Sequence, residues 1–237
     1  MFHTIFYVPL YNALIELTSL FGGSLGFAVV GLTLLVKLIL SPLSYKSIVS
    51  QIEQKKLQPL LEAIKKKYPD QKEQTAKTME LYKEHKTNPF AGCLLIILQL
   101  PVIIALYRVF LAGATVNPLD LYSFVHTPSS IHMVFLGIDM GAKSIVLAIL
   151  AAVSQFLQMH WSPSMKNTTP TVQPDPENMQ ATMAASMTKS MKYTMPVMIG
   201  FFGYAVPGAV ALYWVVSNVF MIVQEKFIER RFAKKVS

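Results

Sequence analysis

The stretch LTLLVKLILSPLSYK, from Leu32 to Lys46, decides the fold that we expect. Its apolar residues belong to a run long enough to cross the hydrocarbon core of a bilayer, which takes about 20 residues. One lysine, Lys37, lies near the middle of this run. Charge is costly inside hydrocarbon, so Lys37 must either reach the membrane surface or face a polar interior in which it has a use.

The composition of the whole chain agrees with a membrane protein. Of 237 residues, 53% are hydrophobic and 14% are charged, whereas a soluble domain has about a quarter of its residues charged. We therefore predict an all-α fold class, an integral membrane five-helix bundle that forms one domain over residues 1–237. The five expected spans are 25–44, 89–111, 143–161, 193–206 and 208–227.

Two helical segments are expected outside these spans. Residues 1–22 are too polar to span, and their leucines recur on one face, which predicts an N-terminal interfacial helix. Residues 46–86 predict a helical hairpin with arms Lys46–Tyr68 and Gln71–His85, the second arm having Asp70 as its N-cap. The remaining segments are an extracytoplasmic segment at 112–142, a cytoplasmic linker and helix at 162–192, and a basic tail at 228–237.

Positive charge is distributed unevenly along this five-span topology. Ten lysines lie between Tyr45 and Thr87, three more between Trp161 and Lys192, and five basic residues from Lys226 onward. These eighteen of the 21 basic residues all fall on one side of the membrane. The positive-inside rule therefore predicts that the N-terminus is outside and the C-terminus is cytoplasmic.

Lys37 has two interpretations. It lies about eight residues, or about 12 Å, from Tyr45 at the expected membrane edge, and its side chain reaches roughly half that distance. Simple snorkelling would thus need a thinned bilayer or a water inlet, so we favour a cation that faces a wet groove between spans, where we expect no carboxylate to neutralise it. Polar side chains on other spans are candidates to line the groove, although each alone could form an ordinary interhelical hydrogen bond: Gln99, Ser154, Gln155, Tyr213, Trp214, Ser217 and Asn218.

Enzymatic and metal-binding patterns are missing from the sequence. The single cysteine, Cys93, lies in an apolar run, and the five histidines show no ligand spacing. There is no serine elbow, no His–Glu metal motif and no P-loop. We expect a protein that is not an enzyme and has no metal or other cofactor.

Three stretches resemble the YidC/Oxa/Alb family of membrane protein insertases. They are NPFAGCLLIILQLPVIIALYRVF (Asn88–Phe110), VFLGIDM (Val134–Met140) and MPVMIGFFGYAVPGAVALYWVVSNVFMIVQ (Met195–Gln224). The resemblance extends over Ile5–Lys235 and includes the order of the spans. It is closest to the compact form of the family, which has no large extracytoplasmic domain.

The resemblance implies an insertase and chaperone of the bacterial plasma membrane, with a hydrophilic groove open to cytoplasm and lipid. The first span of the family carries a positive residue, usually arginine, and Lys37 takes that position. The implied partners are nascent membrane proteins and the lipid bilayer, with the ribosome and the Sec translocon as further candidates. Neither a specific nucleic-acid sequence nor a small-molecule substrate is implied.

Methionines recur at i, i+4 steps before the fourth span. Ordinary packing is the commoner explanation of such a stripe. Methionine is also the adaptable side chain of surfaces that accept varied partners. Met191, Met195 and Met198 are therefore candidates for a surface along which client segments slide.

Two other functions compete with the insertase. An anion or small-solute transporter could use Lys37 as its binding site, but transporters usually contain internal repeats, and we find none. A structural membrane scaffold gives no reason for a lysine within a span. The hairpin and tail lysines have their own default interpretation, contact with anionic lipid, while ribosomal RNA is a second possible partner.

Overall fold

The structure, a computed structural model, describes residues 3–85, 87, 99–105, 107–108, 118–162 and 193–236. It confirms the all-α class, since helices form nearly all of the regular structure in these residues. Residues 99–105, 107–108 and 193–205 are also helical. The named elements are η1 (His3–Tyr7), α1 (Val8–Leu20), α2 (Leu25–Lys56), α3 (Gln58–Lys67), α4 (Gln71–Glu84), η2 (Pro118–Asp120), β1 (Val134–Phe135), β2 (Ile138–Asp139), α6 (Ile145–Trp161) and α8 (Gly208–Val236).

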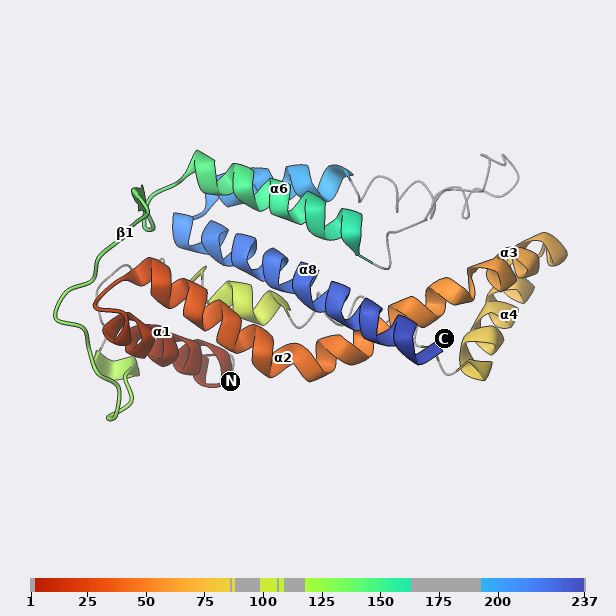
Figure 1. The fold of residues 1–237 in the computed structure, drawn as a ribbon, viewed down its shortest axis with the longest axis horizontal. Helices are drawn as coiled ribbons and strands as arrows, with labels where there is room; N and C mark the ends of the chain where they lie inside the picture. The colour runs from red at the N-terminus through yellow and green to blue at the C-terminus, as the bar shows by residue number, and fades with distance from the viewer. Residues whose placement is uncertain are drawn as a thin grey trace.

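Helices α2 and α8 form the long axis of the molecule (Figure 1). Both are long and apolar enough to cross a membrane, and α6 is a shorter apolar helix. At 1.5 Å per residue, the 32 residues of α2 extend about 48 Å, well beyond the roughly 30 Å of a hydrocarbon core. Large apolar side chains on the outer faces of α2, α6 and the helix at 193–205 are exposed, as expected of lipid-facing surfaces: Leu34, Leu35, Leu38, Ile39, Ile149, Leu150, Val153, Val197 and Phe201.

The hairpin predicted to begin at Lys46 differs from the observed one. Helix α2 continues without a break through Pro42 to Lys56, so no helix boundary lies between residues 44 and 46. The chain bends at Leu57, where Pro59 in the first turn of α3 prevents α2 from continuing. Helices α3 and α4 then form the hairpin (Figure 1). Asp70 is the N-cap of α4 as predicted, accepting a hydrogen bond from the backbone of Lys72 at 3.4 Å.

The basic tail expected at 228–237 is also part of a longer helix, since α8 continues to Val236. Its last turns pack against the end of α2, where Ile228 and Ile48 are buried. The Lys56 ammonium lies 4.8 Å from the centre of the Phe232 ring. A paired extension of α2 and α8 therefore leads to the α3–α4 hairpin.

Small residues bring α6 and the helix at 193–205 close together. A Cβ added to Gly200 would lie 3.1 Å from Ala152, and one added to Gly203 would contact Ala148 and Ala151. In a membrane such small-residue contacts are a main source of helix association, because apolar side chains gain little by leaving lipid. These glycines therefore position α6 against its neighbour.

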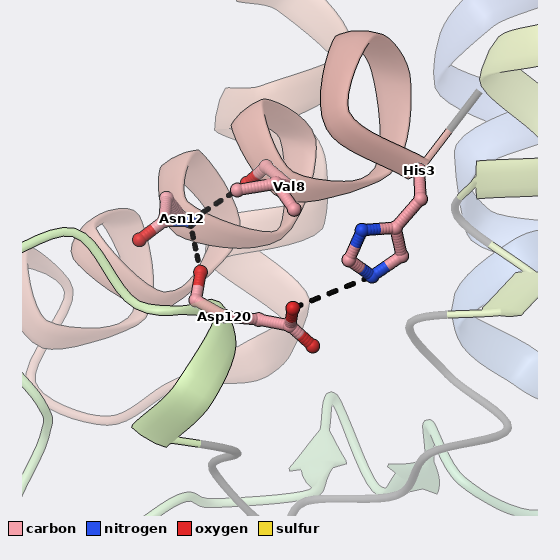
Figure 2. A network of polar contacts seen from close by, with 4 residues as sticks. All are labelled: His3, Val8, Asn12 and Asp120. Atoms are coloured by element: carbon pink, nitrogen blue, oxygen red, sulfur yellow. Dashed lines mark hydrogen bonds and ion pairs between the residues drawn. The ribbon is translucent and has the colours of Figure 1, made fainter. Parts of the chain in front are cut away.

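Helix α1 is packed more deeply than an interfacial helix with one polar face would be. Asn12 is 3% exposed although its side chain is polar. Its amide donates to the carbonyls of Val8 at 2.8 Å and Asp120 at 2.7 Å, and its oxygen accepts from the Tyr122 backbone at 2.7 Å. His3 also lies 3.3 Å from the Asp120 carboxylate (Figure 2). Asn12 thereby fastens the segment from 118 to 125 onto α1.

The β1–β2 hairpin closes the opposite end of the bundle from α3 and α4. Leu136 and Gly137 both have positive φ, 51° and 79°, as a type I′ hairpin turn requires. Phe135 fits against Gly26 of α2, where any Cβ would overlap its ring. After β2, the carbonyls of Met140 and Ala142 accept hydrogen bonds from Ala209 and Gly208, two of the N–H groups that the start of α8 cannot satisfy internally.

The contact between Glu16 and His126 predicts a pH-dependent docking of the segment that follows η2. The Glu16 carboxylate accepts from the His126 backbone at 2.7 Å and lies 3.2 Å from its ring nitrogen. The backbone hydrogen bond, followed by the side-chain bond, holds the pKa of Glu16 below its usual 4.5. A lowered folded-state pKa stabilises docking above pH 4.5, and that contribution is lost as pH falls through the lowered value.

Amide exchange at His126, corrected for its intrinsic pH dependence, should therefore be faster relative to the bundle at about pH 3 than at about pH 6. The variant Glu16→Gln should lose most of this difference. Equal relative protection of His126 at both pH values in the parent chain would contradict the assignment.

Candidate functional site

Lys37 lies inside the bundle and not on its lipid-facing surface. Its exposed fraction is 8%, whereas Leu34 and Leu38 on the same helix are 40% and 62% exposed. The ammonium donates to Gln99 Oε1 at 3.1 Å. Among the described residues no carboxylate forms an ion pair with Lys37. Within the described part of the chain, the hydrogen-bond partner of Lys37 is therefore polar but uncharged.

A first polar seam runs between α2 and α8. Gln99 donates through its Nε2 to the Tyr213 hydroxyl, and Ser217 forms a side-chain hydrogen bond with Tyr213. Further along, Gln224 donates to the Ser41 hydroxyl at 2.7 Å. Ser41 is four residues after Lys37, so both lie on the same face of α2. We call Lys37, Ser41, Gln99, Tyr213, Ser217 and Gln224 the α2–α8 seam.

A second polar seam joins α8 to α6. Asn218 donates to the Ser154 hydroxyl at 3.1 Å. Seven residues later, the Glu225 carboxylate accepts from Gln158 at 3.1 Å and from Ser162 at 3.2 Å. Glu225 and Asn218 are 4% and 7% exposed. We call Ser154, Gln158, Ser162, Asn218 and Glu225 the α6–α8 seam.

Most of the predicted groove residues are thus divided between two seams. Lys37, Gln99, Tyr213 and Ser217 lie together in the first seam, and Ser154 and Asn218 in the second. Gln155 is half-buried and donates to Gln158 at 3.4 Å, which attaches it to the second seam.

The other predicted site residues make no polar contact with either seam within the described part of the chain. Trp214 is half-buried beside Tyr213. On the helix at 193–205, Met195 is half-buried and Met198 is 47% exposed. Met191 lies outside the described residues. The candidate sliding surface is therefore represented here by Met195 and Met198.

Sequence reasoning missed Ser41, Gln158, Ser162, Gln224 and Glu225. A signal was nevertheless present, because Ser154, Gln158 and Ser162 recur at i, i+4 and i+8 and must share one face of α6. On α8, Asn218 and Glu225 are two turns apart and face it. Glu225 lies two residues before the end of the fifth expected span and adjoins the charged end of α8, where a carboxylate is expected to be solvated.

The fold and these seams define a helical membrane protein whose polar interior contains a buried lysine. Comparison with known proteins identifies the family. Residues 16–235 match the family described as 60Kd inner membrane protein. The chain is 32% identical to the membrane protein insertase YidC of Oceanobacillus iheyensis, covering 97% of this chain and 84% of the relative. It is 33% identical to the YidC insertase of Fusobacterium nucleatum, covering 92% of each chain.

A solved structure described as an active YidC insertase, with its first transmembrane domain resolved, has a similar fold. The TM-score is 0.60 at 26% identity, over 94% of this chain and 45% of that one. The chain belongs to this family of membrane protein insertases. The resemblance that was noted in the sequence is confirmed, and the transporter alternative gains no support from these relatives.

Proposed function

We propose that this chain moves nascent membrane segments from the cytoplasm into the bilayer along a hydrophilic path centred on Lys37. The observation that carries the proposal is the buried, charged Lys37 among neutral polar side chains on helices whose outer faces are apolar. A polar flank of a client loses hydration as it enters the membrane, and an ammonium there replaces part of that hydration. An acidic flank gains most, because it supplies the opposite charge.

The driving force is the partitioning of the apolar client segment into lipid, worth about 25 cal/mol per Å² of apolar surface buried. No nucleotide or metal is needed for this step. We assign the second contact with the client to Met195 and Met198, together with Met191. Methionine side chains adapt to segments of different shape, which suits a surface that serves many clients.

Orientation is part of the proposal. The α3–α4 hairpin and the basic end of α8 lie in the cytoplasm of a bacterium, and α1 and the β1–β2 hairpin lie outside the plasma membrane. This placement puts the lysine-rich segments on the side that the positive-inside rule requires. Nascent membrane proteins are the partners, and the ribosome and the Sec translocon are candidate partners on the cytoplasmic side.

The orientation predicts opposite labelling of two cysteines. Ser129→Cys should react with a membrane-impermeant maleimide added to intact cells, and Lys66→Cys should react only after lysis. Both variants are made in a chain in which Cys93 is replaced by serine. Labelling of Lys66→Cys in intact cells would reverse or break the proposed topology.

Reconstitution tests the function against the transporter alternative. The full chain in liposomes should insert a single-span client with a short acidic flank faster than protein-free liposomes do. The same liposomes should show no chloride flux above background. Chloride flux without stimulated insertion would overturn the proposal.

A further inference from the structure

Gln99 uses both ends of its amide within the α2–α8 seam. Its Oε1 accepts from the Lys37 ammonium at 3.1 Å, and its Nε2 donates to the Tyr213 hydroxyl. An ammonium has donors only, so the amide oxygen must face Lys37 and the amide nitrogen must face Tyr213. Tyr213 is 1% exposed, and its hydroxyl also forms a hydrogen bond with the Ser217 side chain. The orientation of the Gln99 amide is therefore determined from both sides.

The helical segment that carries Gln99 is itself packed into the bundle. Val102 and Ala105, three and six residues after Gln99, are 6% and 0% exposed. Residues at this spacing lie on neighbouring positions of one helix face. The Gln99 side chain thus starts from a buried backbone, whereas Lys37 has a flexible stem of four carbons.

A lysine in this position needs such a fixed acceptor. The stem of Lys37 is too short to reach the membrane surface, but it can turn along α2 within the seam towards the hydrated end of the helix. One charge-assisted hydrogen bond to a fixed amide opposes this movement. It occupies one of the three N–H groups of the ammonium and leaves two that no other described residue accepts.

We propose that Gln99 is a positioning residue that anchors the Lys37 ammonium at the depth of Tyr213 and presents its remaining N–H groups to the client flank. The inference rests on the proposed function in that the client is an acidic-flanked membrane segment. Without the anchor, Lys37 turns towards the cytoplasmic surface and its charge no longer lies on the client's path.

Amine labelling tests the anchor without reference to insertion. Liposomes containing the full chain are treated with a water-soluble N-hydroxysuccinimide ester, and peptide mapping gives the modification of each lysine. In Gln99→Met, labelling of Lys37 should rise at least threefold relative to the exposed Lys77. The control Gln51→Met removes a glutamine that bonds Ser47 on the same helix, and it should leave Lys37 labelling unchanged. Equal labelling of Lys37 in the parent and Gln99→Met would overturn the inference.

A double-mutant cycle tests whether Gln99 acts through Lys37. The measured quantity is the ratio of insertion rates for an acidic-flanked client and its neutral counterpart. Gln99→Met should lower this ratio roughly threefold to tenfold, and in a Lys37→Leu background it should cause no further change. A merely structural role would instead make the two effects multiply, because the sites would act independently.

The two proposals fail in different ways. If the ratio of insertion rates in Gln99→Met equals that of the parent chain while the ratio in Lys37→Leu is lowered, only the proposal that Gln99 anchors Lys37 is overturned. An unchanged ratio in Lys37→Leu would overturn the proposed function and with it the role of the anchor in insertion. In that case the labelling experiment would still decide whether Gln99 holds the ammonium.

Discussion

Replacing Glu225 with leucine should lower the melting temperature of the chain by roughly 5–15 °C. The Glu225 carboxylate is buried and accepts hydrogen bonds from Gln158 and Ser162 of α6. Leucine would leave both donors without this acceptor, which costs about 1–3 kcal/mol for each donor. Water at the helix ends can bond to these donors and recover part of that cost. We therefore expect the free energy of unfolding to fall by about 2–4 kcal/mol, as measured by thermal unfolding in detergent.

Two variants separate the hydrogen bonds from the charge. Glu225→Gln keeps an acceptor oxygen in place and should retain most of the stability. Lys226→Leu is the matched control, because Lys226 adjoins Glu225 in the sequence but its side chain is exposed. The Lys226 ammonium lies over the Trp161 ring, 4.0 Å from the ring centre. Losing this cation–π contact should lower the free energy of unfolding by about 0.5–1 kcal/mol. A melting temperature of Glu225→Leu equal to that of the parent would show that the α6–α8 seam does not hold the two helices together.

Local patterns were sufficient to predict the helices and several of their ends. Asp70 caps α4 because a side-chain oxygen before an amphipathic run satisfies one of the free N–H groups of the first turn. The α6 helix likewise lies inside the apolar run from which the third span was predicted. Such features depend on residues within a few positions of each other, so the sequence shows them directly.

Helix continuity was harder to predict. The first span was expected to end at residue 44 and the hairpin to begin at Lys46, yet α2 continues to Lys56. A proline inside a membrane helix is tolerated where side chains and neighbouring helices satisfy the backbone locally. Next to Pro42, Gln224 of α8 donates to the Ser41 carbonyl at 3.5 Å and to the Ser41 hydroxyl at 2.7 Å. Both contacts are tertiary, across 183 residues of sequence.

The burial of Asn12 and Glu225 could not be predicted for the same reason. Each is a polar residue in a segment with a plausible solvated face, and each is buried because a distant segment supplies its partner. For Asn12 the partner is the backbone at Asp120 and Tyr122, and for Glu225 it is the end of α6. Lys37 was easier to single out, because a charge within a long apolar run has no plausible solvated face.

Reversing the charge at position 37 should have the largest effect on insertion. With Lys37→Glu, the rate for acidic-flanked clients should fall roughly tenfold or more, because repulsion is added to the loss of attraction. Pair energies in a partly hydrated site are about 1–2 kcal/mol, and about 1.4 kcal/mol corresponds to a factor of ten. Clients with neutral flanks should be affected least. The measurement is the insertion rate of matched clients into liposomes that contain equal amounts of folded protein.

For the other substitutions at position 37, the insertion rate of acidic-flanked clients should follow the charge of the new side chain. Lys37→Arg should retain insertion of acidic-flanked clients, because the positive charge remains and a guanidinium is less strongly hydrated than an ammonium. Lys37→Leu should be intermediate, since attraction is lost and no repulsion is added. Because Gln99 can donate as well as accept, it can turn its amide towards a glutamate, so Lys37→Glu need not unfold the seam. If Lys37→Glu inserted acidic-flanked clients as fast as the parent chain, the buried ammonium would have no part in binding the client.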